Sequence, residues 1–149
     1  MKNYSLLDRA KKDAWNARLV FAHWDGDELS YDIAAYHVQQ AVEKSMKYVL
    51  SQNKVVFKKQ HDAAFLKEQF EGNSIGLPEW FVPNMDTLDK FVTQARYGTD
   101  LVGARAKILE LLGYVEEYIE SIELEERKLQ NGAEAAEMPD ELAQPRQLP

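Results

Sequence analysis

Apolar side chains recur at steps of three and four along most of this chain, the spacing of helices that bury one face. Near the start, Ser5 precedes Asp8 by three residues, a pair that caps a helix by bonding unpaired backbone N–H groups. A first helix of about four turns should follow and end before the turn at residues 25–27. Its apolar positions are Leu7, Ala10, Ala14, Ala17 and Phe21.

The second stretch predicts a helix that opens at Ser30 and ends near residues 51–53. Residues 55–57 form a short apolar run that resembles a strand. Because no partner strand is evident, we interpret this run as a connector packed on the helices. The expected buried stripe of the second helix is Ala34, Val38, Ala41, Val42, Ser45, Met46 and Val49.

Two shorter helices are expected next. Asp62 should cap a short helix that runs to about Phe70, and Asn84 should cap another that stops at residues 97–98. The glycines and the proline at residues 72–78 indicate a loop between them. Trp80 and Phe81 should anchor that loop to the core.

The last helix should start at Asp100 and be the longest. Its apolar residues form a heptad seam, which is typical of helices packed nearly parallel or antiparallel in a bundle. The seam consists of Leu101, Ile108, Val115, Ile122 and Leu129, with Leu112 and Ile119 between them. The pattern therefore predicts an all-α fold, an up-and-down four-helix bundle with an additional short helix.

Composition adds the expected boundaries of the domain. The 149 residues are 45% hydrophobic and 29% charged, which indicates one globular domain, at residues 1–130. Residues 131–149 carry four acids against one arginine, a net −3, and lack the apolar area that ordering requires. We expect this segment to be a disordered acidic tail. Because the chain has no cysteine, no membrane-length apolar run and no signal-peptide pattern, we expect a cytoplasmic protein.

Charge and motifs exclude several functional classes. The net charge of −7, of which −4 remains outside the tail, disfavours a broad basic face for nucleic acid but not a local positive pocket. Phosphate-cradling glycine loops and the nucleophilic serine elbow are missing from the sequence. Glu-x-x-His pairs are also missing, and His23, His37 and His61 lack ligand spacing. We therefore expect no metal and no resident cofactor, and we interpret the many glutamates of the last helix as a solvated face.

Two segments carry concentrated polar chemistry. On the second helix, Tyr36 and His37 precede the run Gln39-Gln40-Ala41-Val42-Glu43-Lys44. These side chains could bind a ligand, or they could link neighbouring helices through hydrogen bonds. The second segment is Ala95-Arg96-Tyr97-Gly98, between the last two helices. Arg96 stands near the start of the next helix, where a guanidinium and free N–H groups could hold a phosphate, or it could cap a helix end.

With His61-Asp62 and Leu66 between them, these segments resemble the HEPN family, over roughly residues 5–125. The resemblance implies a dimeric helical bundle, often found beside a small nucleotidyltransferase in prokaryotic toxin–antitoxin and defence systems. Many HEPN proteins are metal-independent endoribonucleases, with an arginine followed after four to six residues by a histidine. Arg96 matches that arginine, but Leu101, Val102 and Gly103 occupy the positions of the histidine.

Since leucine or valine cannot transfer a proton, the departure favours a binding module over an enzyme. Our leading hypothesis is a HEPN-like dimer that binds nucleotide or RNA phosphate near Arg96 and pairs with a nucleotidyltransferase-like protein. The ligand-binding candidates are Arg96, Tyr97, Gln40, Glu43, Lys44 and His37. The alternative is an endoribonuclease that uses Arg96 with a displaced base such as His61 or Tyr97. A third hypothesis is a purely structural interaction domain.

Overall fold

A computed structural model describes residues 3–57, 60, 62–93 and 101–137 of the chain. Within these residues every regular element is a helix, so the predicted all-α class is confirmed. The elements are α1 (Leu6–Ala22), α2 (Glu28–Gln52), α3 (Ala63–Gly72), the 3-10 helix η1 (Val82–Asn84), α4 (Met85–Thr93) and α5 (Leu101–Glu137).

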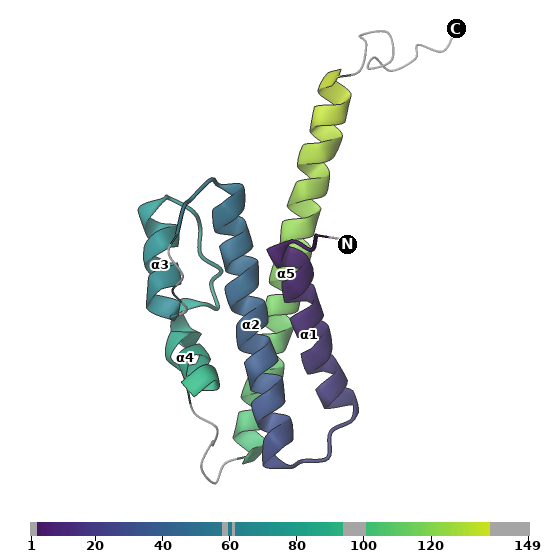
Figure 1. Ribbon diagram of the computed structural model, residues 1–149, viewed down its shortest axis with the longest axis vertical. Helices are drawn as coiled ribbons and strands as arrows, with labels where there is room; N and C mark the ends of the chain where they lie inside the picture. Colours follow the sequence, from purple (N-terminus) through teal and green to yellow (C-terminus); the bar gives the residue numbers. More distant parts are fainter. Residues whose placement is uncertain (1–2, 58–59, 61, 94–100, 138–149) are drawn as a thin grey trace, which may run out of the picture. The chain divides into compact units, whose positions relative to one another are not determined.

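Helix α2 is the central element of the bundle. Figure 1 shows α1 along one side of it and the shorter helices α3 and α4 along the other. The chain divides into two compact units, Met1–Ile119 and Glu120–Pro149, and the boundary falls within α5. The first unit therefore contains α1 to α4 and the first half of α5.

Side-chain caps fix where three of the helices begin. Ser5 and Asp8 form the predicted capping box, with both hydrogen bonds at 3.0 Å. Asp62 caps α3 as predicted. The predicted start of α2 at Ser30 is wrong, because Asp27 accepts the Ser30 backbone N–H at 2.7 Å and is itself the cap. Ser30 instead lies in the first turn and donates its hydroxyl to Asp25.

The segment before α4 is held by aromatic contacts. Phe81 is fully buried, and the Trp80 ring lies parallel to Tyr114 of α5, so this pair anchors the loop as predicted. Asn84 does not cap α4 with its side chain. Its amide donates back to the Trp80 carbonyl at 2.7 Å, and the helix grows out of the 3-10 turn instead.

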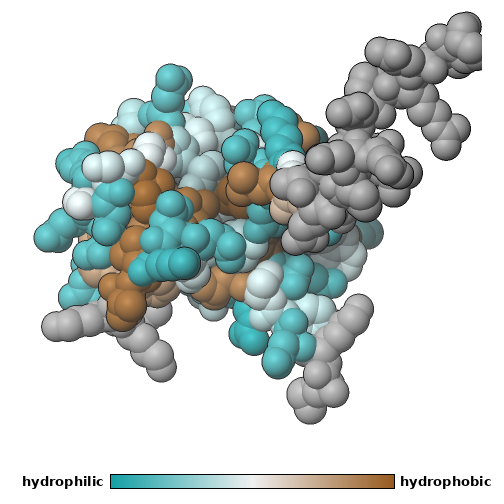
Figure 2. All heavy atoms as spheres, turned by 90° about the horizontal axis from the view of Figure 1, so that it is seen from above, coloured by the Kyte–Doolittle hydropathy of each residue, from teal (hydrophilic) through white to brown (hydrophobic). Residues whose placement is uncertain are grey.

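The core is built from small residues on α1 and larger ones on α2 and α5. Ala10, Ala14 and Ala17 are buried, which allows the axes of α1 and α2 to lie close together. The predicted stripe of α2 is buried except for Val49, which is half-buried. The connector at residues 55–57 forms no strand, as expected. Its Val56 is nevertheless 95% exposed, so this side chain does not pack on the helices. Seen end-on, hydrophobic side chains show between hydrophilic ones at the surface (Figure 2).

The heptad seam of α5 is buried only in its first half. Ile108, Leu112, Val115 and Ile119 are buried as predicted, whereas Ile122 is half-buried and Leu129 is 68% exposed. Helix α5 has 37 residues and the next longest, α2, has 25, so no other described helix could cover the whole seam. The side chain of Leu101 lies outside the described residues.

Helix α5 also continues seven residues past its expected end, Gln130, as far as Glu137. The division into a domain at residues 1–130 and a disordered tail stays a prediction, and residues 138–149 lie outside the described part. Among the helices that the structure describes, none combines the length and the apolar character needed to cross a lipid bilayer.

Candidate functional site

The polar run of α2 lies in a stretch of helix with little access to solvent. No residue from 37 to 50 is exposed, because other elements pack around α2 on several sides. Polar groups removed from water are costly unless they are hydrogen-bonded, and buried charges must be paired. This stretch nevertheless contains His37, Gln39, Gln40, Glu43, Lys44 and Lys47.

Glu43 is at the centre of one pairing network, which lies within α2 itself. Its side chain is only 4% exposed, and its Oε1 accepts the Lys47 ammonium at 2.8 Å. Its Oε2 accepts the amide of Gln39 at 3.2 Å, and the Gln40 amide donates to the Gln39 oxygen at 2.7 Å. Because Gln39 and Lys47 each stand four residues from Glu43, the helical repeat itself brings them to the same carboxylate.

Asp13 of α1 is at the centre of a second network, which joins two helices. Its side chain is 10% exposed. One carboxylate oxygen accepts Nδ1 of His37 at 2.9 Å, and the other accepts the Lys44 ammonium at 2.6 Å. His37 and Lys44 stand seven residues apart, two helical turns, so both lie on the side of α2 that faces α1.

The two networks differ in how far they reach solvent. The side chains of His37 and Lys44 are 22% and 28% exposed, and Gln40 is half-buried. Glu43 and Lys47 are buried. The Tyr36 ring packs edge-on against His37, with 5.3 Å between ring centroids, and Tyr36 is exposed. Tyr36, His37, Gln40 and Lys44 therefore form the accessible part of the polar side of α2.

Of the candidates drawn from the sequence, those on α2 are brought together: His37, Gln40, Glu43 and Lys44. The others, Arg96, Tyr97 and His61, lie outside the described residues. Their proximity to the α2 group is therefore still a prediction. The structure is consistent with both hypotheses for the α2 run, ligand binding and helix linkage. The side chains link two helices, and some of them also reach the surface.

Asp13, which organises the second network, is not among the candidates predicted from the sequence. Its neighbours in the sequence give one signal: it stands on the apolar face of α1, between Ala10 and Ala17, where an unpaired carboxylate would be costly. That position indicates a cationic partner. The sequence does not identify the partner, because Lys44 is 31 residues away.

A second group that the sequence did not indicate gathers at the turn between α1 and α2. The Phe21 and Trp24 rings are stacked with centroids 5.0 Å apart, and Tyr31 meets Trp24 edge-on. The Arg105 guanidinium of α5 lies over both stacked rings, at 5.5 and 5.3 Å from their centroids. Cation–π contacts of this kind stabilise the packing of α5 on this turn.

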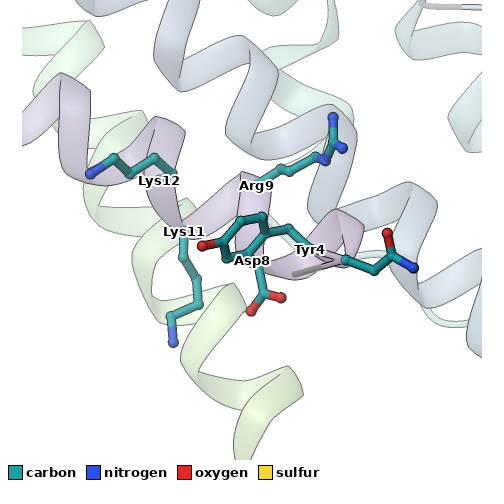
Figure 3. A pocket seen from close by; sticks show the side chains of 6 residues that line it. Tyr4, Asp8, Arg9, Lys11 and Lys12 are labelled. Atoms are coloured by element: carbon teal, nitrogen blue, oxygen red, sulfur yellow. The ribbon is translucent and has the colours of Figure 1, made fainter. Parts of the chain in front are cut away.

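Figure 3 shows a further concave region, at the start of α1. Arg9, Lys11 and Lys12 project in different directions there, so they do not converge on one ligand position. Lys12 lies over the Trp15 ring, and Asp8 is used by the capping box. Among the described residues, no group of three or more potential ligands is arranged to hold a metal ion.

Comparison with known proteins complements this geometry. Searches of the curated proteins and of the solved structures found no match. A protein-family model described as the HEPN domain matches residues 4–128, which includes all of α1 to α4, both polar networks and most of α5. This match covers well over half of the chain, and the helical fold agrees with it. The chain therefore belongs to the HEPN domain family.

Proposed function

We propose that this protein is a dimeric HEPN module that binds nucleotide or RNA phosphate and pairs with a nucleotidyltransferase-like protein in a toxin–antitoxin or defence system. The observation that carries the binding proposal is the accessible polar side of α2. There His37, Gln40 and Lys44 reach the surface beside an exposed aromatic ring, within the part of the chain that matches the family. Cationic donors beside an aromatic ring suit a phosphate next to a base.

Within this proposal the α2 residues have different tasks. Lys44 uses one of its three N–H groups on Asp13, and no side chain in the described part of the chain occupies the other two, which an anion could therefore bind. Glu43 is buried, and it acts indirectly by holding the amide of Gln39, to which Gln40 is bonded. Arg96 and Tyr97 would complete the site from the segment between α4 and α5.

Calorimetric titration of the purified chain with nucleotides and short RNAs tests the binding proposal. We expect heat from at least one of these ligands with the wild type, and at least tenfold weaker binding after Arg96→Ala or Lys44→Gln, since each removes a charge-assisted hydrogen bond. Arg127→Ala, an exposed position on α5, is the matched control and should bind as the wild type does. Absence of heat with every ligand would contradict the binding proposal.

The dimer and the partner need separate measurements. Light scattering should give twice the chain mass, and a nucleotidyltransferase encoded beside this protein should co-purify with it. A strict monomer would contradict any site built across a dimer interface.

The endoribonuclease alternative relies on His61 or Tyr97 as the displaced base. A cleavage assay in EDTA compares the wild type with Arg96→Ala and His61→Ala. If RNA stays intact with all three proteins, this alternative fails.

A further inference from the structure

The position of Asp13 determines the chemistry that His37 can offer. A carboxylate oxygen only accepts hydrogen bonds, so the His37 Nδ1 atom, 2.9 Å from Asp13, must carry a proton. In the neutral ring the second nitrogen, Nε2, is then an acceptor. Among the described residues, Nε2 makes no hydrogen bond. A histidine held by a carboxylate in this way has one tautomer and one orientation.

Protonation of the ring changes the local charge in the same place. Asp13 and Lys44 offset each other, so the trio of Asp13, His37 and Lys44 is neutral when His37 is neutral and carries one positive charge when the imidazole is protonated. Arg9 stands four residues before Asp13 on α1, and its side chain is exposed. Among the described residues, the other titratable residue in contact with His37 is Tyr36 on α2, whose ring packs edge-on against the imidazole.

We propose that His37 is a proton-linked contact for a phosphodiester, with Asp13 as its positioning residue. Nε2 of the protonated ring donates a hydrogen bond to a phosphate oxygen, Lys44 supplies a second donor, and the exposed Tyr36 ring offers a face on which a base stacks. This inference rests on the proposed function, and it adds a ligand class and a pH dependence. Binding of the phosphate to the protonated ring takes up a proton, so affinity rises as the pH falls.

A ligand whose charge does not change with pH is needed, so that any pH dependence of the affinity comes from the protein. The DNA dinucleotide dTpdT keeps a single negative charge near neutral pH and lacks the 2′-hydroxyl needed for cleavage. It would be titrated into the full chain, with ¹⁵N-labelled histidines observed by NMR from about pH 8 to about pH 5.5. We expect the Nε2 signal of His37 to shift with ligand, and affinity to rise about tenfold over this range.

Two variants and one control separate a binding role from a structural one. His37→Gln should abolish the pH dependence, whereas His23→Gln, at an exposed histidine, should keep it. Asp13→Asn should no longer hold His37 in a single tautomer, which would change the chemical shifts of its two ring nitrogens. The same variant should bind more weakly at low pH. Melting followed by circular dichroism checks that each variant is folded. An unchanged pH dependence in His37→Gln, or a His37 signal indifferent to dTpdT, overturns the inference.

The same experiment distinguishes this inference from the proposed function. If Arg96→Ala abolishes binding of RNA while His37 never responds to ligand, the phosphate site stands and the role of His37 fails. If His37 responds and Arg96→Ala binds as the wild type does, the role of His37 stands and that of Arg96 fails.

Discussion

Two buried carboxylates, Glu43 and Asp13, both pair with side chains of α2, but their surroundings differ. Glu43 is paired within α2, at positions that the helical repeat fixes, and both its carboxylate and the Lys47 side chain are buried. Asp13 is paired across the interface of α1 and α2, and both of its partners keep part of their surface in water. A charge network enclosed in the core can only hold the fold together. One that reaches the surface can also meet a ligand.

Removal of the enclosed carboxylate should have the largest effect on stability. Glu43→Ala leaves the Lys47 ammonium, 10% exposed, without its carboxylate, and we expect a loss of about 3–5 kcal/mol in the free energy of unfolding. Urea denaturation followed by circular dichroism measures it. The double variant Glu43→Ala, Lys47→Met removes both charges and should recover much of the loss. If the double variant is as unstable as the single one, the pair is not the cause.

Asp13→Asn should cost less, about 1–2 kcal/mol, because Lys44 can turn toward water when its partner is lost. The same urea experiment compares the two sites directly. A loss equal to that of Glu43→Ala would show that the interface network is as enclosed as the one within α2, and it would remove the accessible site from which the proposed function is argued.

An exposed ion pair should contribute less to the free energy of unfolding than either buried carboxylate. Arg18 of α1 contacts Glu116 of α5, and both side chains are more than a third exposed. A double-mutant cycle with Arg18→Ala and Glu116→Ala should give a coupling energy of about 0.2–1 kcal/mol, which added salt should decrease. A coupling above that of Asp13 with Lys44 would contradict the ranking by burial.

The smallest effect concerns Asp25, which is fully exposed. The Ser30 hydroxyl, followed by the backbone N–H of Asp27, lowers the pKa of Asp25 below its ordinary value of 3.8. A lowered pKa in the folded state means stability that is present above pH 3.8 and lost as the pH falls through the folded pKa. Ser30→Ala should therefore reduce stability slightly at neutral pH and not at all in strong acid. Thermal melts at both pH values check the sign.

The sequence predicted most of the fold because the helices and two of their caps are local features. The Ser5 box and the Asp62 cap each involve residues three apart, and the buried stripe of α2 follows from its periodicity. Errors arose where two local solutions compete. Asp27 and Ser30 are both residue types that cap helices well. The Asn84 side chain donates to the preceding Trp80 carbonyl instead of accepting a backbone N–H from the first turn of α4.

The candidate site was less predictable, because its organising contact is not local. His37, Gln40, Glu43 and Lys44 could be selected from one run of sequence, but the division into a closed and an accessible network depends on Asp13, in another helix. Periodicity places Asp13 on the inner face of α1 without giving the alignment of α1 against α2. Only the packed helices supply that alignment.

The aromatic contacts described above give the protein its own optical reporters. Each of the three tryptophans has different surroundings: Trp15 lies under Lys12, Trp24 is stacked on Phe21, and Trp80 is parallel to Tyr114. Variants that retain a single tryptophan would let fluorescence follow the middle of α1, the turn between α1 and α2, and the loop before α4 one at a time. Unfolding could then be observed segment by segment without any added dye.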